Sequence, residues 1–415
     1  MADGAFNALR AAREEAYSTP LHKIDVSLGE RFRDNTIWPF FERLRHEDPV
    51  HFTAESEFGS YWSITRYHDI VEVETNPAVF SSQGSISIDE PDPDFTLPMF
   101  IAMDPPKHDA QRKVISPIVS PHNLLNMEPI IRERAGKILD ELPIGETFDW
   151  VDRVSVELTT QMLATLFDFP FEERRKLTYW SDITTADMSE SMDLDQVKAE
   201  LMGCAAYFQN LWNVRVNSAP AGDLISMLAH GEATRDMPPM EFLGNILLLI
   251  VGGNDTTRNS ITGGLLALNE YPDQYARLRA DPALITGMVP EIIRWQTPVA
   301  HMRRTALSDM EFGDKTIRKG DKVVMWYVSG NRDETAIADP SAFVIDRDRP
   351  RQHLSFGFGI HRCVGNRLAE MQLRVVWEEI LKRFPLIEVV EEPVRLKSCF
   401  LRAYRSMLVR IPARN

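Results

Sequence analysis

The sequence predicts a mainly α-helical protein with smaller β-sheets drawn from both halves of the chain. Apolar residues recur at helical spacing in several stretches, of which the clearest are 38–47, 67–75, most of 107–269, and 368–383. Short runs of β-branched and aromatic residues bounded by turn residues favour strands at 50–52, 61–64, 302–324 and 406–411. No Gly/Ser-rich or low-complexity linker divides the 415 residues, so we expect a single domain over 1–415.

Residues 1–37 precede the first predicted helix and are interpreted as an N-terminal extension, and their first twenty residues lack the apolar segment of a signal peptide. The first helix is expected at Trp38–Glu47, followed by two short strands that turn at Gly59. The next helix, Tyr67–Thr75, should end before Asn76-Pro77, because proline disfavours helical conformation in the residue that precedes it.

Residues 81–106 are predicted to form a long loop, because they contain five prolines and no regular period. The loop nevertheless carries many apolar side chains, namely Ile86, Ile88, Phe95, Leu97, Met99, Phe100 and Ile101. Two interpretations have equal weight. The loop either folds over an apolar ligand or packs on its own side chains.

The rest of the chain alternates between helical and strand patterns. Residues 107–269 are dominantly helical, and 239–269 is a long apolar helix within them. Strand and turn signals follow at 302–324, and an irregular, charged, proline-containing stretch occupies 333–351. The strong amphipathic pattern of 368–383 predicts one more helix before a strand-like end.

The bulk composition excludes several classes of protein. The net charge of −15 argues against nucleic-acid binding, which needs a basic face. No apolar run approaches the roughly 20 residues needed to cross a bilayer, so we expect no membrane span. The three cysteines, Cys204, Cys363 and Cys399, are too sparse for a disulfide framework and lack zinc-ligand spacing. A cytoplasmic location is therefore expected.

The most informative segment is 353–365, His-Leu-Ser-Phe-Gly-Phe-Gly-Ile-His-Arg-Cys-Val-Gly. The residues that carry the pattern F-G-x-G-x-x-x-C-x-G are Phe356, Gly357, Gly359, Cys363 and Gly365. This pattern resembles the cysteine-ligand loop of the cytochromes P450. Five fixed positions within ten residues make the match specific.

The resemblance extends over nearly the whole chain and implies the cytochrome P450 fold, a triangular, prism-like helical fold with a small β subdomain. It implies that Cys363 is the thiolate ligand of haem b (iron protoporphyrin IX), with Phe356 shielding the sulfur. Elementary chemistry agrees, because glycines allow a close approach to a flat ring and the following helix favours a thiolate. A buried structural thiol is the alternative, and it is our interpretation of Cys204 and Cys399.

A second signature interrupts the apolar helix 239–269 with Gly252-Gly253-Asn254-Asp255-Thr256-Thr257. Each glycine costs a helix about 1 kcal/mol relative to alanine, and such local conflict is expected at functional sites. The segment resembles the family's oxygen-binding signature, (A/G)-G-x-(D/E)-T. The resemblance implies that Thr256 hydrogen-bonds dioxygen and that Asp255 relays protons from solvent. The alternative is a bent helix whose Asp and Thr find their partners in the core.

Glu291-Ile-Ile-Arg294 resembles the E-x-x-R motif of the family, in which the i, i+3 pair has a folding role. Asn331-Arg-Asp and Asp346-Arg-Asp are its candidate partners. The two haem carboxylates need cationic or hydrogen-bonding partners as well. The candidates aligned with the family are His108, Arg112, Arg304 and His361, with Arg303 as the alternative to Arg304. A solvated surface charge is the alternative for each of them.

The resemblance implies the reaction RH + O₂ + 2e⁻ + 2H⁺ → ROH + H₂O. No flavin or iron–sulfur domain is recognisable in the chain, so electrons should come from NAD(P)H through a ferredoxin reductase and a [2Fe–2S] ferredoxin. The residues expected to dock the acidic ferredoxin are Arg112, Lys113, Arg362 and Arg367. We expect a monomer.

Within the family, the strings 253–260, 301–306 and 359–374 resemble the bacterial medium-chain alkane terminal hydroxylases. Terminal (omega) hydroxylation of alkanes or related alkyl chains needs a channel that presents only the methyl end. The candidate pocket residues are Ile86, Ile88, Phe95, Leu97, Met99, Phe100, Leu248, Leu249, Val251, Gly252, Val299, Met302 and Phe400. Met188 and Met192 are candidates for a lid. Fatty acids, terpenoids and other small apolar molecules remain alternative substrates, and about half of the pocket candidates are expected to be plain core.

Three other functions remain open. A peroxide-driven peroxygenase usually lacks an acid–alcohol pair, so Asp255 and Thr256 count against it. A non-catalytic haem sensor or electron carrier needs neither an oxygen-relay helix nor an apolar lid. A haem-free structural protein would lack the CO-bound absorption band that gives the family its name.

Overall fold

The computed structural model describes residues 2–185 and 192–415. It is mainly α-helical with small sheets, as the sequence predicts. Contacts within the chain group it into two compact units. Unit 1 is drawn from residues 1–90, 263–363 and 389–409, and unit 2 from 91–262, 364–388 and 410–415. The expectation of a single domain stays a prediction.

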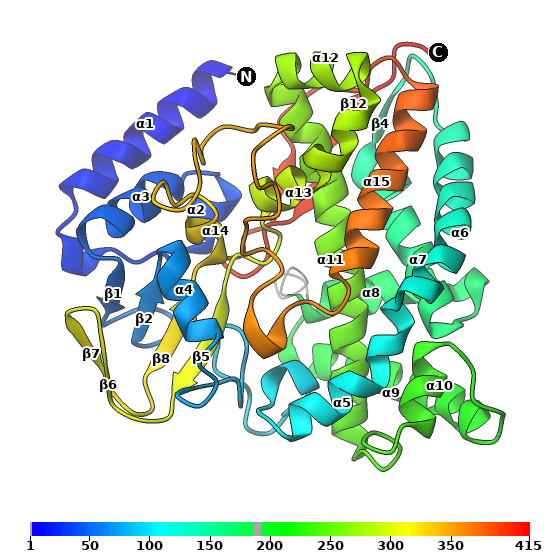
Figure 1. The fold of residues 1–415 in the computed structure, drawn as a ribbon, viewed down its shortest axis with the longest axis horizontal. Coiled ribbons are helices and arrows are strands. Elements are labelled where there is room, and N and C mark those ends of the chain that lie inside the picture. The colour runs from blue at the N-terminus through cyan, green and yellow to red at the C-terminus, as the bar shows by residue number, and fades with distance from the viewer. Residues whose placement is uncertain (1, 186–191) are drawn as a thin grey trace. The chain divides into compact units, whose positions relative to one another are not determined.

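Unit 1 contains a five-stranded sheet in the order β1-β2-β8-β5-β3 (Figure 1). Its strands are β1 (Val50–Thr53), β2 (Tyr61–Ile64), β3 (Phe80–Ser81), β5 (Met302–Ala306) and β8 (Lys322–Met325). The pair β2–β8 is parallel and the other neighbours are antiparallel. Gly59 has φ +75° in the β1–β2 turn, which confirms the predicted position of that turn.

The other strands of the chain are short. They are β4 (Thr147–Asp149), β6 (Met310–Phe312), β7 (Lys315–Ile317), β9 (Glu388–Val389), β10 (Val394–Arg395), β11 (Tyr404–Ser406) and β12 (Leu408–Arg410). The hairpin of β6 and β7 turns at Gly313, where φ is +62°. This turn was also expected from the glycine.

Unit 1 also contains several helices. They are α1 (Ala2–Ser18), α2 (Gly29–Arg33), α3 (Trp38–Glu47), α4 (Tyr67–Glu74), α12 (Pro272–Ala280), α13 (Ile285–Gln296) and α14 (Tyr327–Gly330). Helix α1 lies within the segment that we interpreted as an extension. It buries Ala12 and Ala16 in a cluster that contains Phe40 and Trp326. The N-terminal segment is therefore part of the core of unit 1.

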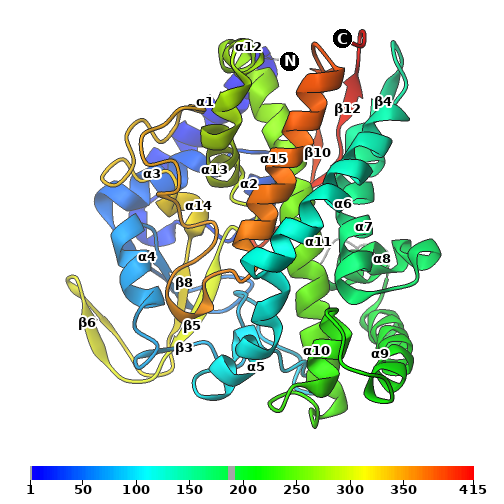
Figure 2. The same ribbon diagram turned by 45° about the vertical axis from the view of Figure 1, so that its right-hand side comes forward.

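Unit 2 is built almost entirely of helices. They are α5 (Lys107–Ile115), α6 (Pro121–Asp140), α7 (Glu157–Phe167), α8 (Arg175–Thr184), α9 (Leu194–Val216), α10 (Leu224–His230) and α15 (Asn366–Arg383). Helices α6 and α15 run side by side in both ribbon views (Figures 1 and 2). Arg132 of α6 joins them through ion pairs to Glu378 at 2.6 Å and Glu379 at 2.9 Å. The chain passes between the units inside α11 (Pro239–Glu270), after Thr262.

The predicted loop over 81–106 is irregular except for Ser81, which ends β3, and the short 3₁₀ turn Phe100–Ala102. It belongs to unit 1 as far as Glu90 and to unit 2 from Pro91. Among the described residues, no helix has the length and apolarity that crossing a membrane requires.

Candidate active site

The loop before Cys363 is closed by a backbone hydrogen bond from the amide of Cys363 to the carbonyl oxygen of Phe356, at 2.8 Å. Gly357 and Gly359 have φ of +65° and +61°, a region that favours glycine. A Cβ on Gly359 would overlap the carbonyl oxygen of Glu74, the last residue of α4. We expected these glycines to serve the approach of a flat ring. Within unit 1 they allow residues 353–363, here called the cysteine loop, to approach Glu74 of α4 closely.

The three cysteines lie in two different environments. Cys204 and Cys399 are buried, and burial raises the pKa of both thiols far above the usual range. This confirms our interpretation of both as buried thiols. Cys363 is exposed, three residues before α15 begins at Asn366, so the alternative of a buried thiol does not hold for it. Gly365 is the N-cap residue of α15.

The pair Glu291–Arg294 is present on α13, and both side chains are completely buried. The Arg294 guanidinium donates two hydrogen bonds of 2.7 Å to the carboxylate and a third, of 2.9 Å, to the carbonyl oxygen of Asn331. Arg347 adds a second cation at 3.1 Å from the carboxylate. Both predicted partner segments are therefore in place. The Asn331 amide then donates to the Ser355 hydroxyl at 2.9 Å, which connects α13 to the cysteine loop.

Arg303 and Arg304 are consecutive on β5, so their side chains point to opposite faces of the sheet. Arg304 is buried and donates at 2.9 Å to the carboxylate of Glu74. The Tyr327 hydroxyl donates to the other oxygen of that carboxylate. Burial raises the pKa of Glu74, and Arg304 opposes the shift. Arg303 instead pairs with Glu90 at 3.1 Å.

Glu74 was not among the functional residues predicted from the sequence. It ends a helix that matches no functional motif, and the only signal was an acid at the end of an apolar pattern. The other haem-carboxylate candidates have partners as well. The His361 ring lies 2.9 Å from the Ser82 hydroxyl in unit 1. In unit 2, His108 is buried on α5, 2.7 Å from the carboxylate of Asp109 and four residues before the half-buried Arg112.

Helix α11 has an open face in its middle, where buried and half-buried positions alternate. Leu248, Gly252 and Thr256 are spaced i, i+4, i+8 and thus share a face, and none of them is fully buried. Their neighbours Leu247 and Ile250 are completely buried. A Cβ on Gly252 would meet nothing within 4 Å. The Thr256 hydroxyl donates at 2.9 Å to the Gly252 carbonyl oxygen. Along this face the apolar side chain of Leu248 is therefore followed by Gly252, which has no side chain, and then by the hydroxyl of Thr256.

Asp255 is completely buried and has its own polar route toward the surface. One carboxylate oxygen accepts a hydrogen bond from Ser181 of α8 at 2.8 Å, and the other lies 2.6 Å from the Arg258 guanidinium. Arg258 also pairs at 2.7 Å with Asp182, whose side chain is 37% exposed. Burial raises the pKa of Asp255, while Arg258 opposes the shift. Asp255 thus has partners within the protein, and they lead from the interior to solvent.

The candidate pocket residues fall into two groups, one in each unit. Those that are half-buried, as a lining requires, are Ile86, Phe95, Leu97, Met99, Leu248, Leu249, Val251, Val299, Met302 and Phe400. Ile88 and Phe100 are buried. In unit 1, the Phe400 ring packs edge-on against His301, with centroids 5.2 Å apart, and the Ala300 amide donates to the Phe400 carbonyl oxygen at 2.8 Å.

In unit 2, the second part of the loop rests on α11. The Phe100 amide donates to the Asn245 side chain at 2.9 Å. A Cβ on Gly244 would overlap the Pro98 carbonyl oxygen, so this glycine permits the close contact. The loop therefore meets α11 one turn before Leu248. Of the two candidate lid residues, Met192 is half-buried and Met188 lies outside the described residues.

No cluster of three or more His, Cys, Asp or Glu side chains suited to a metal ion occurs in residues 2–185 and 192–415. A single cysteine as protein ligand is the arrangement found in thiolate-ligated haem.

Comparison with known proteins gives a consistent result. The Cytochrome P450 family model matches residues 221–403. The chain is 38% identical over 407 residues to linalool 8-monooxygenase of Pseudomonas putida, covering 94% of this chain and 99% of that protein. It is 32% identical to the methyl-branched lipid omega-hydroxylase of Mycobacterium tuberculosis, over 89% of this chain and 90% of that one.

Solved structures agree with the sequence relatives. Cytochrome P450-153 from Novosphingobium aromaticivorans has a TM-score of 0.88 and 45% identity, over 93% of this chain and 98% of that one. CYP153D17 from Sphingomonas sp. PAMC 26605 has the same TM-score and coverage, with 48% identity.

Proposed function

The chain belongs to the cytochrome P450 family and is a haem-thiolate monooxygenase, and on that premise we propose that it hydroxylates the terminal methyl group of medium-chain alkanes or related alkyl chains. The open face of α11 carries this proposal. Leu248 contributes an apolar side chain, a Cβ at Gly252 would meet no other atom within 4 Å, and Thr256 places its hydroxyl one turn further along the same face.

The residues present fit the cofactor that the family uses. In unit 1, Cys363 is an exposed residue at the end of a loop that is held by contacts with α4 and α13. The residues proposed to hold the haem carboxylates are His108, Arg112, Arg304 and His361. When bound, haem supplies the activation of dioxygen that allows one oxygen atom to enter a C–H bond.

Asp255 and Thr256 are proposed to handle the protons that the reaction consumes. A carboxyl group whose pKa is raised by burial holds a proton more readily near neutral pH than an exposed one does. Arg258 stays protonated and pairs with both Asp255 and the half-exposed Asp182, and we propose that the Asp255 carboxyl is reprotonated from the solvent side of this ion-pair chain after each turnover. The Thr256 hydroxyl donates to its own helix, and its lone pairs remain available to accept a hydrogen bond.

The choice of substrate follows from the chemistry of the lining. All candidate pocket residues are apolar or glycine, which suits an alkyl chain better than a fatty acid whose carboxylate needs a partner. A relative named for omega-hydroxylation of methyl-branched lipids adds support. A terpenoid alcohol is the second candidate, because the 38% identical relative is a linalool 8-monooxygenase.

Electrons are proposed to reach the enzyme from NAD(P)H through a ferredoxin reductase and a [2Fe–2S] ferredoxin. Arg362 and Arg367 flank Cys363 in the sequence, and both are exposed; Lys113 is exposed on α5, beside the half-buried Arg112. These cations suit an acidic partner. We also propose a cytoplasmic monomer, which agrees with the sparse cysteines.

The test is a product analysis with a reconstituted ferredoxin chain. Linear alkanes from hexane to dodecane, matching fatty acids, and linalool are each supplied, and the alcohols are identified by gas chromatography–mass spectrometry. We expect primary alcohols to dominate with alkanes. Mainly secondary alcohols, or oxidation of linalool alone, would refute the proposal.

Thr256→Ala should divert NAD(P)H into hydrogen peroxide, while Thr257→Ala, at a buried neighbouring position, serves as the control. Tight coupling in the Thr256 variant would remove this residue from the mechanism. Turnover with peroxide alone would favour the peroxygenase. Absence of a spin shift with every apolar ligand would favour the haem sensor.

A further inference from the structure

The part of the loop that belongs to unit 1 is held along its backbone. The backbone amide of Arg303 donates to the Ile86 carbonyl oxygen at 2.8 Å. The Arg303 side chain donates to the Asp89 carbonyl oxygen at 2.9 Å. Residues 86–90 therefore run beside β5 as a fixed strip, although they contain no regular secondary structure. We call these five residues the wall segment.

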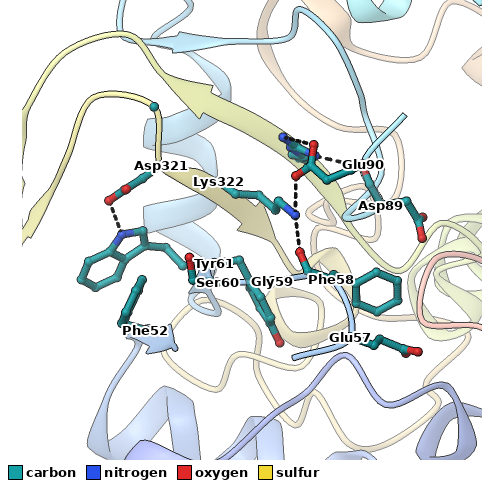
Figure 3. Close-up of a pocket in the computed structure, with 13 residues that line it drawn as sticks. Phe52, Glu57, Phe58, Gly59, Ser60, Tyr61, Asp89, Glu90, Asp321 and Lys322 are labelled. Atoms are coloured by element: carbon teal, nitrogen blue, oxygen red, sulfur yellow. Dashed lines mark hydrogen bonds and ion pairs between the residues drawn. The ribbon is translucent and has the colours of Figure 1, made fainter. Parts of the chain in front are cut away.

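Lys322 of β8 contacts the wall segment and the β1–β2 turn at once (Figure 3). Its ammonium donates at 2.9 Å to the Ile88 carbonyl oxygen and at 2.6 Å to that of Phe58, and it lies 2.7 Å from the Glu90 carboxylate. Only 6% of the Lys322 side chain is exposed, so these three oxygens replace its hydration. The lysine lines a cavity of about 700 Å³, and its partners tie the wall segment to the β1–β2 turn.

His301 binds the backbone amide of Ile88, the residue whose carbonyl oxygen accepts from Lys322. The Ile88 amide donates to His301 Nε2 at 3.0 Å, so Nε2 must be the unprotonated nitrogen. Nδ1 therefore carries the hydrogen and donates it to the Cys399 carbonyl oxygen at 2.9 Å. Burial lowers the pKa of His301 to about 4, and the ring is neutral at physiological pH. Both ring nitrogens of His301 therefore form hydrogen bonds, Nε2 with the Ile88 amide and Nδ1 with the Cys399 carbonyl oxygen.

The two groups that His301 joins are separate parts of the candidate pocket. Ile88 is itself buried but belongs to the wall segment, which carries the half-buried candidate Ile86; Cys399 precedes Phe400, whose ring packs on the imidazole. The imidazole also packs edge-on against the Trp326 ring, with centroids 4.8 Å apart. A change at position 301 would consequently move the wall segment and Phe400 relative to each other.

We propose that His301 is a positioning residue that sets the spacing between the wall segment and Phe400 and thereby determines which carbon of the substrate is oxidised. The proposal rests on the proposed function for the identity of the substrate. Terminal and penultimate carbons are one bond apart, so a small displacement of one wall changes which of them is presented for reaction. Neither the family motifs nor the candidate pocket residues assigned this role to His301.

The test compares variants that remove the hydrogen bonds of His301 to different extents. His301→Phe keeps a ring against Phe400 but loses both bonds. His301→Gln can still accept from the Ile88 amide. His51→Phe is the matched control, because His51 is also buried in unit 1, where Nε2 contacts the Ile24 carbonyl oxygen at 2.9 Å.

Two readouts are measured on haem-loaded protein whose CO-bound band confirms thiolate ligation. The first is the ratio of terminal to subterminal alcohol, and the second is amide hydrogen exchange in the wall segment. His301→Phe loses two hydrogen bonds, and each lost bond shifts an equilibrium by up to about tenfold, so we expect the ratio to fall by about tenfold or more. Exchange at Ile88 should accelerate, His301→Gln should recover most of both losses, and His51→Phe should leave both unchanged.

An unchanged product ratio in His301→Phe overturns the proposal, and so does unchanged exchange at Ile88. Failure of the proposed function gives a different result. In that case the wild-type protein forms no terminal alcohol from alkanes, and the ratio is measured between the products of whichever apolar substrate it does oxidise. If His301→Phe does not fold, His301→Asn takes its place, because asparagine can donate to Cys399 but is too short to reach Ile88.

Discussion

Replacing Gly359 by alanine tests whether α4 positions the cysteine loop. Gly359 has φ +61°, and its missing Cβ would overlap the backbone of Glu74. Gly313, in the β6–β7 turn, has φ +62° and nothing within 4 Å of the same position. Gly313→Ala therefore measures the cost of the backbone conformation alone, and Gly359→Ala measures that cost together with the steric overlap.

The magnitudes follow from these two contributions. An alanine in the left-handed region costs about 1–2 kcal/mol at either position. At Gly359 the new methyl group would also lie 3.2 Å from the Glu74 carbonyl carbon, besides overlapping the oxygen. Placing a methyl group in such an already filled position costs a further ~1–3 kcal/mol. We therefore expect Gly359→Ala to destabilise the protein by about 1–3 kcal/mol more than Gly313→Ala does.

The assay is thermal unfolding of haem-loaded protein, followed by circular dichroism and by the haem absorption band. For a chain of this length, 1 kcal/mol corresponds to a shift of about 1 °C in the midpoint. Gly359→Ala should also lose part of its thiolate-type CO-bound band before unfolding, whereas Gly313→Ala should keep it. Equal midpoints with an intact band in both variants would refute the idea that contact with α4 sets the position of the loop.

Three further results are expected. Asp255→Asn should slow product formation more than it weakens substrate binding and should raise the solvent deuterium isotope effect; an unchanged rate and isotope effect would exclude it from proton transfer. Burial lowers the pKa of His301 to about 4 and of His353 to about 3, whereas unfolded imidazoles titrate near 6.5. The unfolded chain therefore takes up protons at higher pH than the folded protein does, so the stability should be constant above pH 7 and should fall as the pH drops from about 6.5 to about 3; a flat profile of unfolding midpoints would contradict this. Glu291→Ala leaves buried guanidinium groups without their carboxylate and should cost about 3–5 kcal/mol, while Arg10→Ala, in an exposed pair, should change the midpoint little.

Local patterns predicted the regular elements well where the chain itself marks their ends. Helix α3 has the predicted bounds, Trp38–Glu47, and α15 begins at Asn366, two residues before the predicted start. Helix α1 was missed because its buried stripe consists of alanines. Ala12 and Ala16 pack closely in the core, but they do not give the apolar contrast that marks an amphipathic helix.

Candidate site residues could be proposed from the sequence where it carries a compact motif, as at Cys363 and Asp255. It was not predictable where the function of a side chain depends on a distant partner. Glu74 meets Arg304 across 230 residues of sequence, and Ile88 meets His301 across 213. Neither pairing leaves a local pattern, because spacing in one segment says nothing about which other segment lies beside it.

The division of the chain has a consequence for its synthesis. Unit 1 receives its last segment at residues 389–409 and unit 2 at 410–415, so a ribosome must deliver nearly the whole chain before either unit is complete. Contacts that join such distant segments form slowly, and the unfinished chain exposes apolar surface meanwhile. A nascent chain that stalls after Thr262 ends inside α11 with both units incomplete, and it would be a substrate for chaperones and proteases rather than a shortened but folded protein.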